Sequence, residues 1–536
     1  MSKSIFILLF SLLFHFQLLA QGFQVRNIYI ETKKVFEPDD KDWFFGSEFL
    51  NFFHHTTRKY VIEDELLFKP NSITDEDYIY ETERNLRKRS LFSSINIELD
   101  SIGFNSYDVY VTTKDRWSLY PSIPFGTGGG EYKYGLKLEE FNFLGSGTYL
   151  KGELLYRSEN NIGLSGQFYL DKKRFLRTPF NLELNLYTSK IKTNQELNFN
   201  KPYFNLDTKY SYGIYFNNSY GQTYLYNQDD ENKLVNYSNQ DFKLFFSRSW
   251  YRFDKIFFNA AIELNNSEIK SQNLRRAFDN SGKFLIMFSS LSQKFFPVNK
   301  INYYHTEDIP IGGYGSATLG KIFPIADKDG DNSYYVAGQG EISYYDGHLY
   351  LFGQLSGASS FIKSKGRYTY QEFLGLGFYR ITENILLAAR IYQQTSWNWD
   401  AFRQLLLDND RGLRGYNLNK LWGDNRIINN IELRYFPDLP LFVFNFSGVL
   451  FADIGAVWNQ EQKITETQFY SSVGAGLRLH FTKSSDGGQT IRIDFAYNLY
   501  EKKFGGIIIS TKQLFSAFGE HSYKIPKAFG NDFDIE

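Results

Sequence analysis

From Trp117 onward the chain repeats one pattern, in which segments of about ten residues alternate apolar and polar side chains between turns rich in Gly, Asn and Asp. A period of two places every second side chain on the same face of a strand. Short turns such as Asp346-Gly347 alternate with long polar stretches at 218–239, 269–283 and 398–425. Strands that cross a bilayer, with long loops on one side only, have this asymmetry. The clearest segments are Tyr132–Glu140, Tyr149–Tyr156, Phe180–Thr188, Phe242–Trp250, Phe257–Leu264, Tyr368–Tyr379, Ile427–Phe436, Val473–Phe481 and Ile491–Leu499.

The N-terminal residues predict export from the cytoplasm. Lys3 precedes the apolar run Ile5–Phe14, and Leu18-Leu19-Ala20 precedes Gln21, so residues 1–20 have the organisation of a signal peptide. The alternative is a membrane anchor, but the run is shorter than the roughly 20 apolar residues that span a bilayer. No later stretch approaches the roughly 18 apolar residues of a membrane helix. A closed barrel is then the structure that satisfies backbone polar groups in lipid.

Composition agrees with a barrel. Aromatic residues make up 19% of the chain, with 53 Phe and 40 Tyr, and such residues collect at the two interfaces of membrane barrels. The 59 basic and 60 acidic residues balance, so a nucleic-acid partner is not expected. The chain has no Cys, which excludes disulfides and a lipid-modified Cys. A secreted soluble all-β protein such as a propeller is the alternative, but no repeat of fixed period appears.

Residues 22–116 differ in texture and predict a small α/β domain. Val25, Ile28 and Ile30 alternate as in a strand, and Arg58–Phe68 has a helical pattern. A second helix is expected to begin at Thr74, which suits the N-cap and is followed by three acidic residues in the first turn. Two alternating segments follow at 95–99 and 107–111.

Several stretches resemble the BamA/TamA-like outer-membrane assembly and translocation superfamily. Within Thr74–Leu99, "ETERNLRKRSLFSSINIEL" resembles the second helix and following strand of that family's POTRA module. "NFLGSG" (142–147) and "KPYFNLD" (201–207) resemble its barrel turns, and "RGLRGY" (411–416) resembles the tip of its inward-folded sixth loop. "IELRYFP", "FADIGAVW" (451–458) and "VGAGLRLHF" (473–481) follow in the family's order. The resemblance covers nearly the whole chain after residue 20, but leaves room for only one POTRA module.

The resemblance and the strand pattern together imply the architecture. A signal peptide (1–20) precedes a POTRA-like periplasmic domain (22–116), an outer-membrane β-barrel (117–518) and a C-terminal tail (519–536). The fold class is an all-β transmembrane barrel of about 16–20 antiparallel strands, an even number, behind a small α/β domain. The implied function is insertion or translocation of proteins at the outer membrane. The implied partners are outer-membrane lipids, an unfolded or extended client polypeptide and periplasmic accessory proteins. A passive or lipid-related barrel of the same fold is the alternative, because fold does not determine function.

Strand parity predicts which charged side chains face the lumen. Where the apolar residues of a strand face lipid, the intervening polar residues point inward. By this rule Ile454 and Trp458 face lipid, whereas Gly455 faces the lumen. An ordinary polar barrel interior explains inward charges equally well. The charged residues expected on the lumen wall are Glu432, Arg434, Asp453, Arg478, Arg492 and Asp494, with His480.

The loop tip that carries Arg411, Arg414, Gly415 and Tyr416 would, by the resemblance, lie inside the lumen, with Arg414 paired to Asp453. An unpaired guanidinium would be costly to bury there. Glu432 is the competing partner for Arg414, and Arg434 or Arg478 could satisfy Asp453 instead.

The predicted barrel seam is weak on both sides. The first candidate strand, 117–125, contains Pro121 and Pro124, each of which lacks an N–H for pairing. The last strand opens with Gly505-Gly506, which also weakens pairing. A seam of this kind suits a barrel that opens laterally. The alternative is that the strand begins near residue 122 and the prolines belong to a linker.

Enzymatic activity is not expected. The seven His are scattered, and the chain has no G-x-S-x-G, H-E-x-x-H or P-loop motif. No cofactor, nucleotide or metal is implied.

Overall fold

The computed structural model describes most of the chain between residues 22 and 530. The predicted signal peptide, 1–20, lies outside the described residues. The described ranges are 22–38, 46–128, 131–158, 162–205, 207–225, 233–252, 254–270, 275–304, 306–325, 331–441, 444–481, 490–510, 513–515 and 523–530.

The N-terminal part forms a small domain in which a four-stranded sheet carries helices. The sheet has the order β2-β1-β4-β3, with β1 and β4 parallel and the other pairs antiparallel. Val25, Ile62, Leu86 and Val111 are fully or almost fully buried between the sheet and the helices. Its elements are β1 (Phe23–Lys33), α2 (Ser47–Phe53), α3 (Lys59–Glu63), β2 (Ile73–Thr74), α4 (Glu76–Lys88), β3 (Phe92–Gly103) and β4 (Ser106–Asp115).

Two local predictions for this domain were wrong in detail. The N-cap of α4 is Asp75, whose side chain accepts a hydrogen bond from Tyr78 N at 3.1 Å. Thr74 instead pairs with Phe23 in β2, so the strand takes the residue that the sequence assigned to the cap. Helix α3 is also shorter than the helical pattern over 58–68, because Asp64 already ends it.

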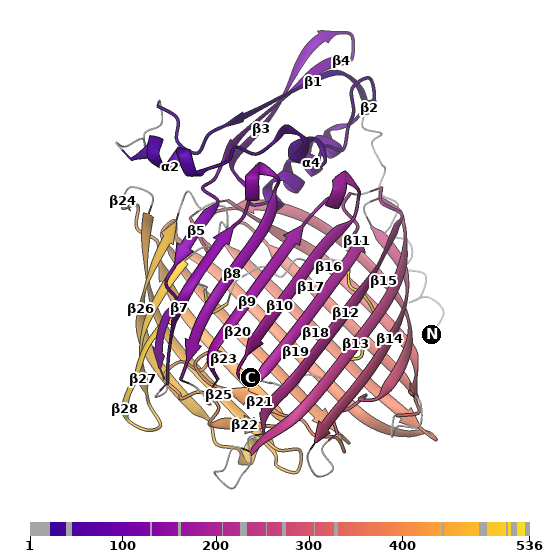
Figure 1. Cartoon of the computed structure of the whole chain (residues 1–536), viewed down its shortest axis with the longest axis vertical. Coiled ribbons are helices and arrows are strands. Elements are labelled where there is room, and N and C mark those ends of the chain that lie inside the picture. Colours follow the sequence, from indigo (N-terminus) through magenta and orange to yellow (C-terminus); the bar gives the residue numbers. More distant parts are fainter. Residues whose placement is uncertain are drawn as a thin grey trace, which may run out of the picture.

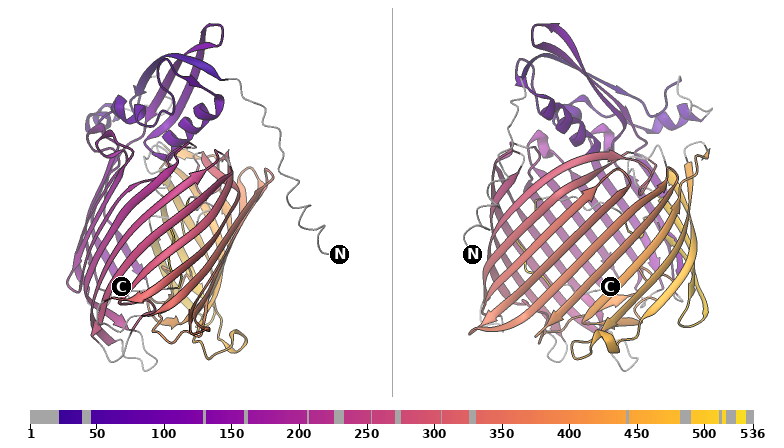
Figure 2. Two further views of the ribbon diagram at one scale, coloured as in Figure 1. Left: turned by 90° about the vertical axis from the view of Figure 1, so that its right-hand side faces the viewer. Right: turned by 180° about the vertical axis from the view of Figure 1, so that it is seen from behind.

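The strands that follow, apart from one separate two-stranded ladder, close into one barrel, and Figures 1 and 2 show the small domain standing over one end of it. Its first strands are β5 (Leu119–Ser122), β6 (Phe125–Gly128), β7 (Glu131–Glu140), β8 (Thr148–Arg157), β9 (Gly163–Lys172), β10 (Asn181–Ser189) and β11 (Lys192–Lys201). The long strands are β12 (Tyr210–Leu225), β13 (Lys233–Trp250), β14 (Lys255–Lys270), β15 (Ser281–Val298), β16 (Glu307–Pro324), β17 (Ser333–Tyr345), β18 (Leu349–Ile362), β19 (Lys365–Thr382) and β20 (Ile385–Trp397). The last ones are β23 (Asn425–Tyr435), β24 (Pro440–Leu441), β25 (Phe444–Trp458), β26 (Tyr470–Phe481), β27 (Thr490–Asn498) and β28 (Lys503–Ser510).

Over the described residues the barrel has 20 antiparallel strands, which confirms the predicted fold class and an even number within the predicted range. Here β5 and β6 count as one strand because both pair with β7, and β24 counts with β23 because it forms the turn into β25. Neighbouring strands pair in long continuous registers, such as Tyr210–Leu225 of β12 with Lys233–Arg248 of β13.

That pair also corrects a loop prediction. Residues 218–239 were expected to form a long polar loop, yet 218–225 and 233–239 are strand. The polar side chains there bond across the ladder, as Ser219 and Tyr237 do through their hydroxyl groups at 2.8 Å. Polar residues can therefore extend a strand beyond the bilayer, where period-two apolar patterning no longer marks it.

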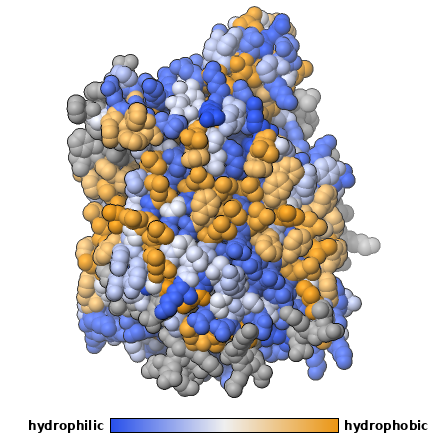
Figure 3. All heavy atoms as spheres, in the orientation of Figure 1, coloured by the Kyte–Doolittle hydropathy of each residue, from blue (hydrophilic) through white to orange (hydrophobic). Residues whose placement is uncertain are grey.

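The outer surface of the barrel is apolar. Leu136, Phe288, Ile342 and Leu450 from four different strands are each more than half exposed. Figure 3 shows hydrophobic residues gathered across the strands of one face, with hydrophilic residues prevailing at the end away from the small domain. Such a belt is expected where strands face lipid. Among the described residues, no helix is long and apolar enough to cross a membrane.

Ion pairs hold the small domain against the turns at one end of the barrel, called here the small-domain rim; the opposite end is called the far rim. Arg252, in the β13–β14 turn, makes two hydrogen bonds of 3.0 and 3.1 Å to Asp75 at the start of α4. Arg87 of α4 reaches Asp308 of β16 at 3.0 Å. Arg174, in the β9–β10 turn, pairs with Glu65 at 2.9 Å.

The barrel wall ends earlier than its predicted boundary at residue 518. The last strand, β28, stops at Ser510 on the small-domain rim, and residues 513–515 already lie inside the barrel. Trp458 was also predicted wrongly: it is 6% exposed rather than facing lipid. It ends β25 at the far rim, where Gly423 packs against its backbone, so loop contacts replace lipid contacts.

Candidate functional site

The connection between β20 and β23 folds into the barrel lumen. It contains a short ladder of β21 (Leu405–Leu407) with β22 (Leu421–Gly423), and the residues between them form the loop tip. Leu405–Leu407 and Leu413 are completely buried. The barrel thereby removes these apolar side chains of the loop from water.

Side chains within the loop shape its tip. Asp408 accepts hydrogen bonds from the backbone N–H groups of Asp410 and Arg411 at 3.1 and 3.2 Å. Asn409 Oδ1 accepts one from Gly415 N at 2.6 Å. Gly412 and Gly415 have φ values of +109° and +85°, a region that residues with a Cβ rarely adopt.

Arg414 is the centre of the site. Its Nε donates to Asp453 Oδ2 and its Nη2 to Asp453 Oδ1, both at 2.8 Å, which is a bidentate pair. The remaining Nη1 donates to Glu432 at 2.8 Å and to Asp494 at 3.3 Å. The structure therefore places Arg414 against the expected partner and also against the competing one, and the side chains of all three residues that it contacts are completely buried.

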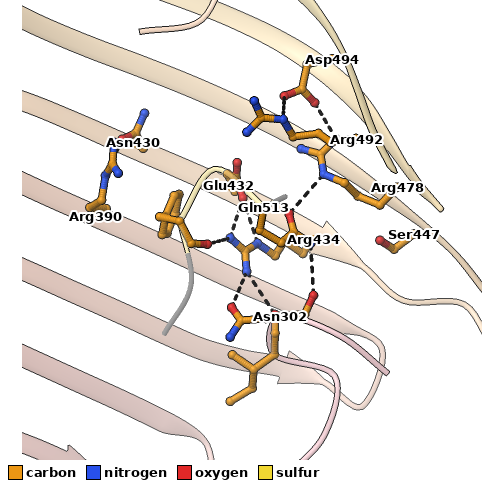
Figure 4. A network of polar contacts seen from close by, with 12 residues as sticks. Asn302, Arg390, Asn430, Glu432, Arg434, Ser447, Arg478, Arg492, Asp494 and Gln513 are labelled. Atoms are coloured by element: carbon orange, nitrogen blue, oxygen red, sulfur yellow. Dashed lines mark hydrogen bonds and ion pairs between the residues drawn. The ribbon is translucent and has the colours of Figure 1, made fainter. Parts of the chain in front are cut away.

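The wall charges form one network around Arg414, part of which is drawn in Figure 4. Arg434 pairs with Glu432 at 2.8 Å, and Arg478 pairs with Asp494 at 2.6 Å. Arg492 approaches Asp494 at 3.4 Å. All the predicted lumen-wall charges thus lie inside the barrel and are brought together. Arg434 and Arg478 contact Glu432 and Asp494, respectively, rather than Asp453.

The charge of Arg414 follows from this environment. Burial by itself would lower the pKa of its guanidinium, but the carboxylates of Asp453, Glu432 and Asp494 raise it well above its usual value. Loss of one partner from a buried ion pair costs about 3–5 kcal/mol, because the other charge stays buried. The network therefore fixes the loop tip in one position.

Two other predicted tip residues lie apart from this network. Arg411 pairs with Asp408 of its own loop at 2.8 Å and is partly exposed. Tyr416 is buried against Tyr470, and its hydroxyl donates to Ser471 O at 2.9 Å. Both stabilise the loop, Arg411 from within and Tyr416 through strand β26.

Three residues that support the tip, Asn430, Arg390 and Phe451, were missed by the sequence analysis. Asn430 Nδ2 donates to Asp453 Oδ1 at 2.6 Å and to Gly412 O at 2.7 Å. Arg390 Nε donates in turn to Asn430 at 2.9 Å. The Arg414 guanidinium also lies 3.5 Å from the centre of the Phe451 ring. Parity could have found Asn430 and Phe451, since each lies two residues before a predicted inward residue, Glu432 or Asp453.

The loop tip touches the last strand backbone to backbone. A Cβ atom on Gly505 of β28 would lie 2.5 Å from both the Cα and the carbonyl oxygen of Gly415. Asn498 Nδ2 of β27 donates to the same carbonyl at 3.4 Å. Gly505 is therefore where the inward loop contacts the strand that closes the barrel. Gly506, next to it, has a φ of +111°.

The barrel closes between β28 and the β5–β6 strand, and this seam is built from the shortest strands. Strand β28 has 8 residues, and β5 and β6 have 4 each, whereas β12–β20 have 13–18. Pro121 lies inside β5 opposite Leu138, and Pro124 separates β5 from β6. The alternative of a strand beginning near residue 122 is wrong, because β5 begins at Leu119.

Comparisons with known proteins concern the fold. No family model and no curated protein matches the sequence. Among solved structures, the chain is similar to BamA from Haemophilus ducreyi lacking POTRA domains 1–3, at 12% identity over 91% of this chain and 83% of that one, with a TM-score of 0.37. CdiB from Acinetobacter baumannii matches at 10% identity over 91% and 73%, with a TM-score of 0.46.

The FrpB iron transporter from Neisseria meningitidis also matches, at 8% identity over 92% of this chain and 90% of that one, with a TM-score of 0.38. The likeness is one of barrel fold, which BamA and CdiB share with an iron transporter.

Proposed function

We propose that this chain is an outer-membrane barrel that inserts or translocates polypeptides through the seam between β28 and β5–β6. The observation that carries the proposal is the contact of the buried Arg414 loop with Gly505 of β28, beside the shortest strands of the wall. A loop anchored by a buried bidentate pair supports one side of a closure that short paired strands hold weakly.

The strands on both sides of the seam are also short. On one side of the closure β7–β11 have 9 or 10 residues, and on the other β27 and β28 have 9 and 8, compared with 18 in β13, β15, β16 and β19. A strand needs about 9–11 residues to cross the hydrocarbon core, so strands near this limit match the bilayer only barely. The seam therefore lies where the strands are short, so only a short length of paired strand must come apart for a client strand to enter.

The chemistry of client binding is strand addition. A separated β28 or β6 edge would offer unpaired N–H and C=O groups to an extended client. We propose that the small domain is a POTRA-like module in the periplasm. It offers another edge at β3, which is the last strand of its sheet and has mostly exposed residues. Recognition of the main chain suits clients of varied sequence and requires no catalytic group or cofactor.

A crosslink across the seam tests the proposal. Because the chain has no Cys, engineered pairs between 117–125 and 505–510 report only the seam. We expect an oxidised pair to leave a folded barrel that no longer supports the assembly of other outer-membrane barrels, and reduction to restore that support. A matched pair at Ala475 and Phe495, which already face each other in β26 and β27, is the control. Full activity of the oxidised seam would show that the seam does not open.

Depletion separates this function from its alternative. Loss of many different outer-membrane barrels after depletion supports an assembly role. Loss of a single exported partner, or a change in lipid alone, supports the passive or lipid-related barrel instead.

A further inference from the structure

The chain does not end at the rim where β28 stops, and it turns back into the lumen. Gln513 Nε2 donates to Asn302 O at 3.1 Å, and Arg478 Nε donates to Gln513 Oε1 at 3.3 Å (Figure 4). Phe515 is 6% exposed and packs with Phe378, and its carbonyl accepts a hydrogen bond from Arg434 at 2.9 Å. The segment is thus anchored at the small-domain rim by the arginines of the wall.

Residues 523–530 then line the opposite side of the lumen. Tyr523 packs against Tyr203, which follows β11 at the small-domain rim. At the other end Gly530 O accepts a hydrogen bond from Arg403, in the far-rim loop, at 2.8 Å. Eight residues reach at most about 26–29 Å when fully extended, close to the roughly 30 Å of a bilayer core. This segment, called the lumen strap (residues 523–530), therefore runs along the length of the lumen.

The wall holds the strap mainly by its backbone. Lys243 of β13 donates to Pro526 O at 2.7 Å, and the N–H of Phe529 donates to the hydroxyl of Tyr335 in β17 at 2.8 Å. With Arg403 on Gly530, three main-chain groups are bound by side chains of β13, β17 and the far-rim loop. Contacts to main-chain groups fit an extended polypeptide of many sequences.

Two side-chain contacts add selectivity. Lys524 forms an ion pair with Glu341, whose side chain is 2% exposed. The ring of Tyr523 packs against both Tyr203 and Phe257, with ring centres 4.7 and 5.3 Å away, and those two rings also contact each other. The site thus favours an aromatic residue followed by a cation.

We propose that the lumen wall of β13, β14 and β17, with Arg403, is a binding track for an extended polypeptide, and that the chain's own residues 523–530 occupy it as a removable plug. The Arg414 loop fills the lumen against β23, β25 and β27, and the strap fills it against the other wall. Removing the strap would leave a water-filled path between the loop and β13–β17. This inference does not depend on the proposed function, because a plugged barrel of any activity would behave in this way.

Single-channel recording in planar bilayers tests the plug. The variant lacking residues 511–536 is expected to conduct several-fold more than the full chain, while keeping a heat-modifiable band that shows a folded barrel. A synthetic peptide of residues 519–536, added to the bath, is expected to return the conductance toward that of the full chain. An unchanged conductance in the folded truncated barrel would overturn the proposal, and so would a peptide that neither binds nor blocks.

Exchanging the charges of the Lys524–Glu341 pair tests whether the peptide blocks the conductance by binding in the track. A K524E peptide is expected to block the truncated barrel several-fold less well, and an E341K truncated barrel is expected to recover the block by that peptide. Equal block by both peptides on both barrels would mean that the peptide acts elsewhere. If the truncated barrel does not fold, the full-length K524E variant replaces it, because its chain length is unchanged. It should open more often than the unaltered chain, and this increase should disappear in the K524E/E341K double variant.

Discussion

At the scale of single residues, Arg414 shows what buried charges contribute to this barrel. Its guanidinium contacts three carboxylates, all completely buried, so a neutral substitution removes the cation that pairs with Asp453 and one of those that Glu432 and Asp494 face. Arginine is also required by geometry, since lysine offers no planar pair of donors to a carboxylate.

We predict that Arg414→Ala and Asp453→Ala each lower the temperature at which the heat-modifiable barrel band is lost, and each reduce function. Removing one partner costs about 3–5 kcal/mol in a buried pair. The double variant should be little worse than either single one, because the two residues act as a unit. Arg414→Lys should retain only part of the stability. Fully additive losses would show that Arg414 and Asp453 act separately.

A second prediction at the scale of single residues concerns Gly505. Gly505→Ala places a Cβ 2.5 Å from the backbone of Gly415, so either the loop tip or β28 must move. We expect an increased rate of proteolysis within 398–424 and reduced function in the folded barrel. Gly448→Ala in β25, where a Cβ meets nothing within 4 Å, is the matched control and should behave as the unaltered chain. Equal behaviour of the two variants would mean that the loop does not rest on the last strand.

At the scale of secondary-structure elements, alternation predicted the strands better than it predicted their ends. The second half of β13 was found from Phe242–Trp250, but its first half mixes polar and apolar residues on both faces and was assigned to a loop. The path of the chain after β28 was missed for a related reason. Phe515 and Tyr523 have no periodic neighbours, and only the assembled wall shows what they bind.

The lumen site shows the same division between local pattern and assembled structure. Parity placed Glu432, Asp453 and Asp494 inward from one strand each. Which carboxylate meets which arginine depends on the relative stagger of four strands and a loop. That stagger is a property of the closed barrel, and the pairing of Arg414 was expected mainly from the family resemblance.

The small domain carries an element-scale prediction. Residues 22–116 contain a complete sheet and a buried core that includes Val25, Leu86 and Val111, so we expect this fragment to fold alone with mixed α/β circular dichroism. Asp75→Ala in the fragment removes the N-cap of α4 and should cost about 1 kcal/mol of stability in urea. Asp77→Ala, two residues later in the first turn of α4 and without the capping bond that Asp75 makes, is the control. A random-coil spectrum would show that the domain needs the barrel.

The molecule as a whole combines an apolar outside with an interior filled by its own chain. Its outward side chains, such as Ile342 at 70% exposure and Leu319 at 59%, are stable only against lipid. Its lumen holds an apolar cluster around Phe378, Phe436 and Phe515, unlike the water-filled interior of a porin. The structure is thus that of a closed barrel whose lumen is occupied by segments of its own chain.

The last prediction concerns where this molecule resides. An exposed apolar belt formed by strands all around the barrel cannot remain in water. Moving each large apolar side chain out of water lowers the free energy by about 1.5–3 kcal/mol. We expect the protein to fractionate with outer membranes, with a mature N-terminus near Gln21, and to run as a compact band in semi-native gels that shifts on boiling. The shift follows from the 20 paired strands, which resist detergent until heat breaks the ladder. Replacing outward Ile342 and Leu319 together by Asp should reduce the membrane-bound fraction, because a charge facing lipid is costly. The same substitutions at lumen-facing Ser343 and Thr318 are the control for strand damage. Recovery of the unaltered protein as a soluble periplasmic species would contradict the barrel and every proposal that depends on it.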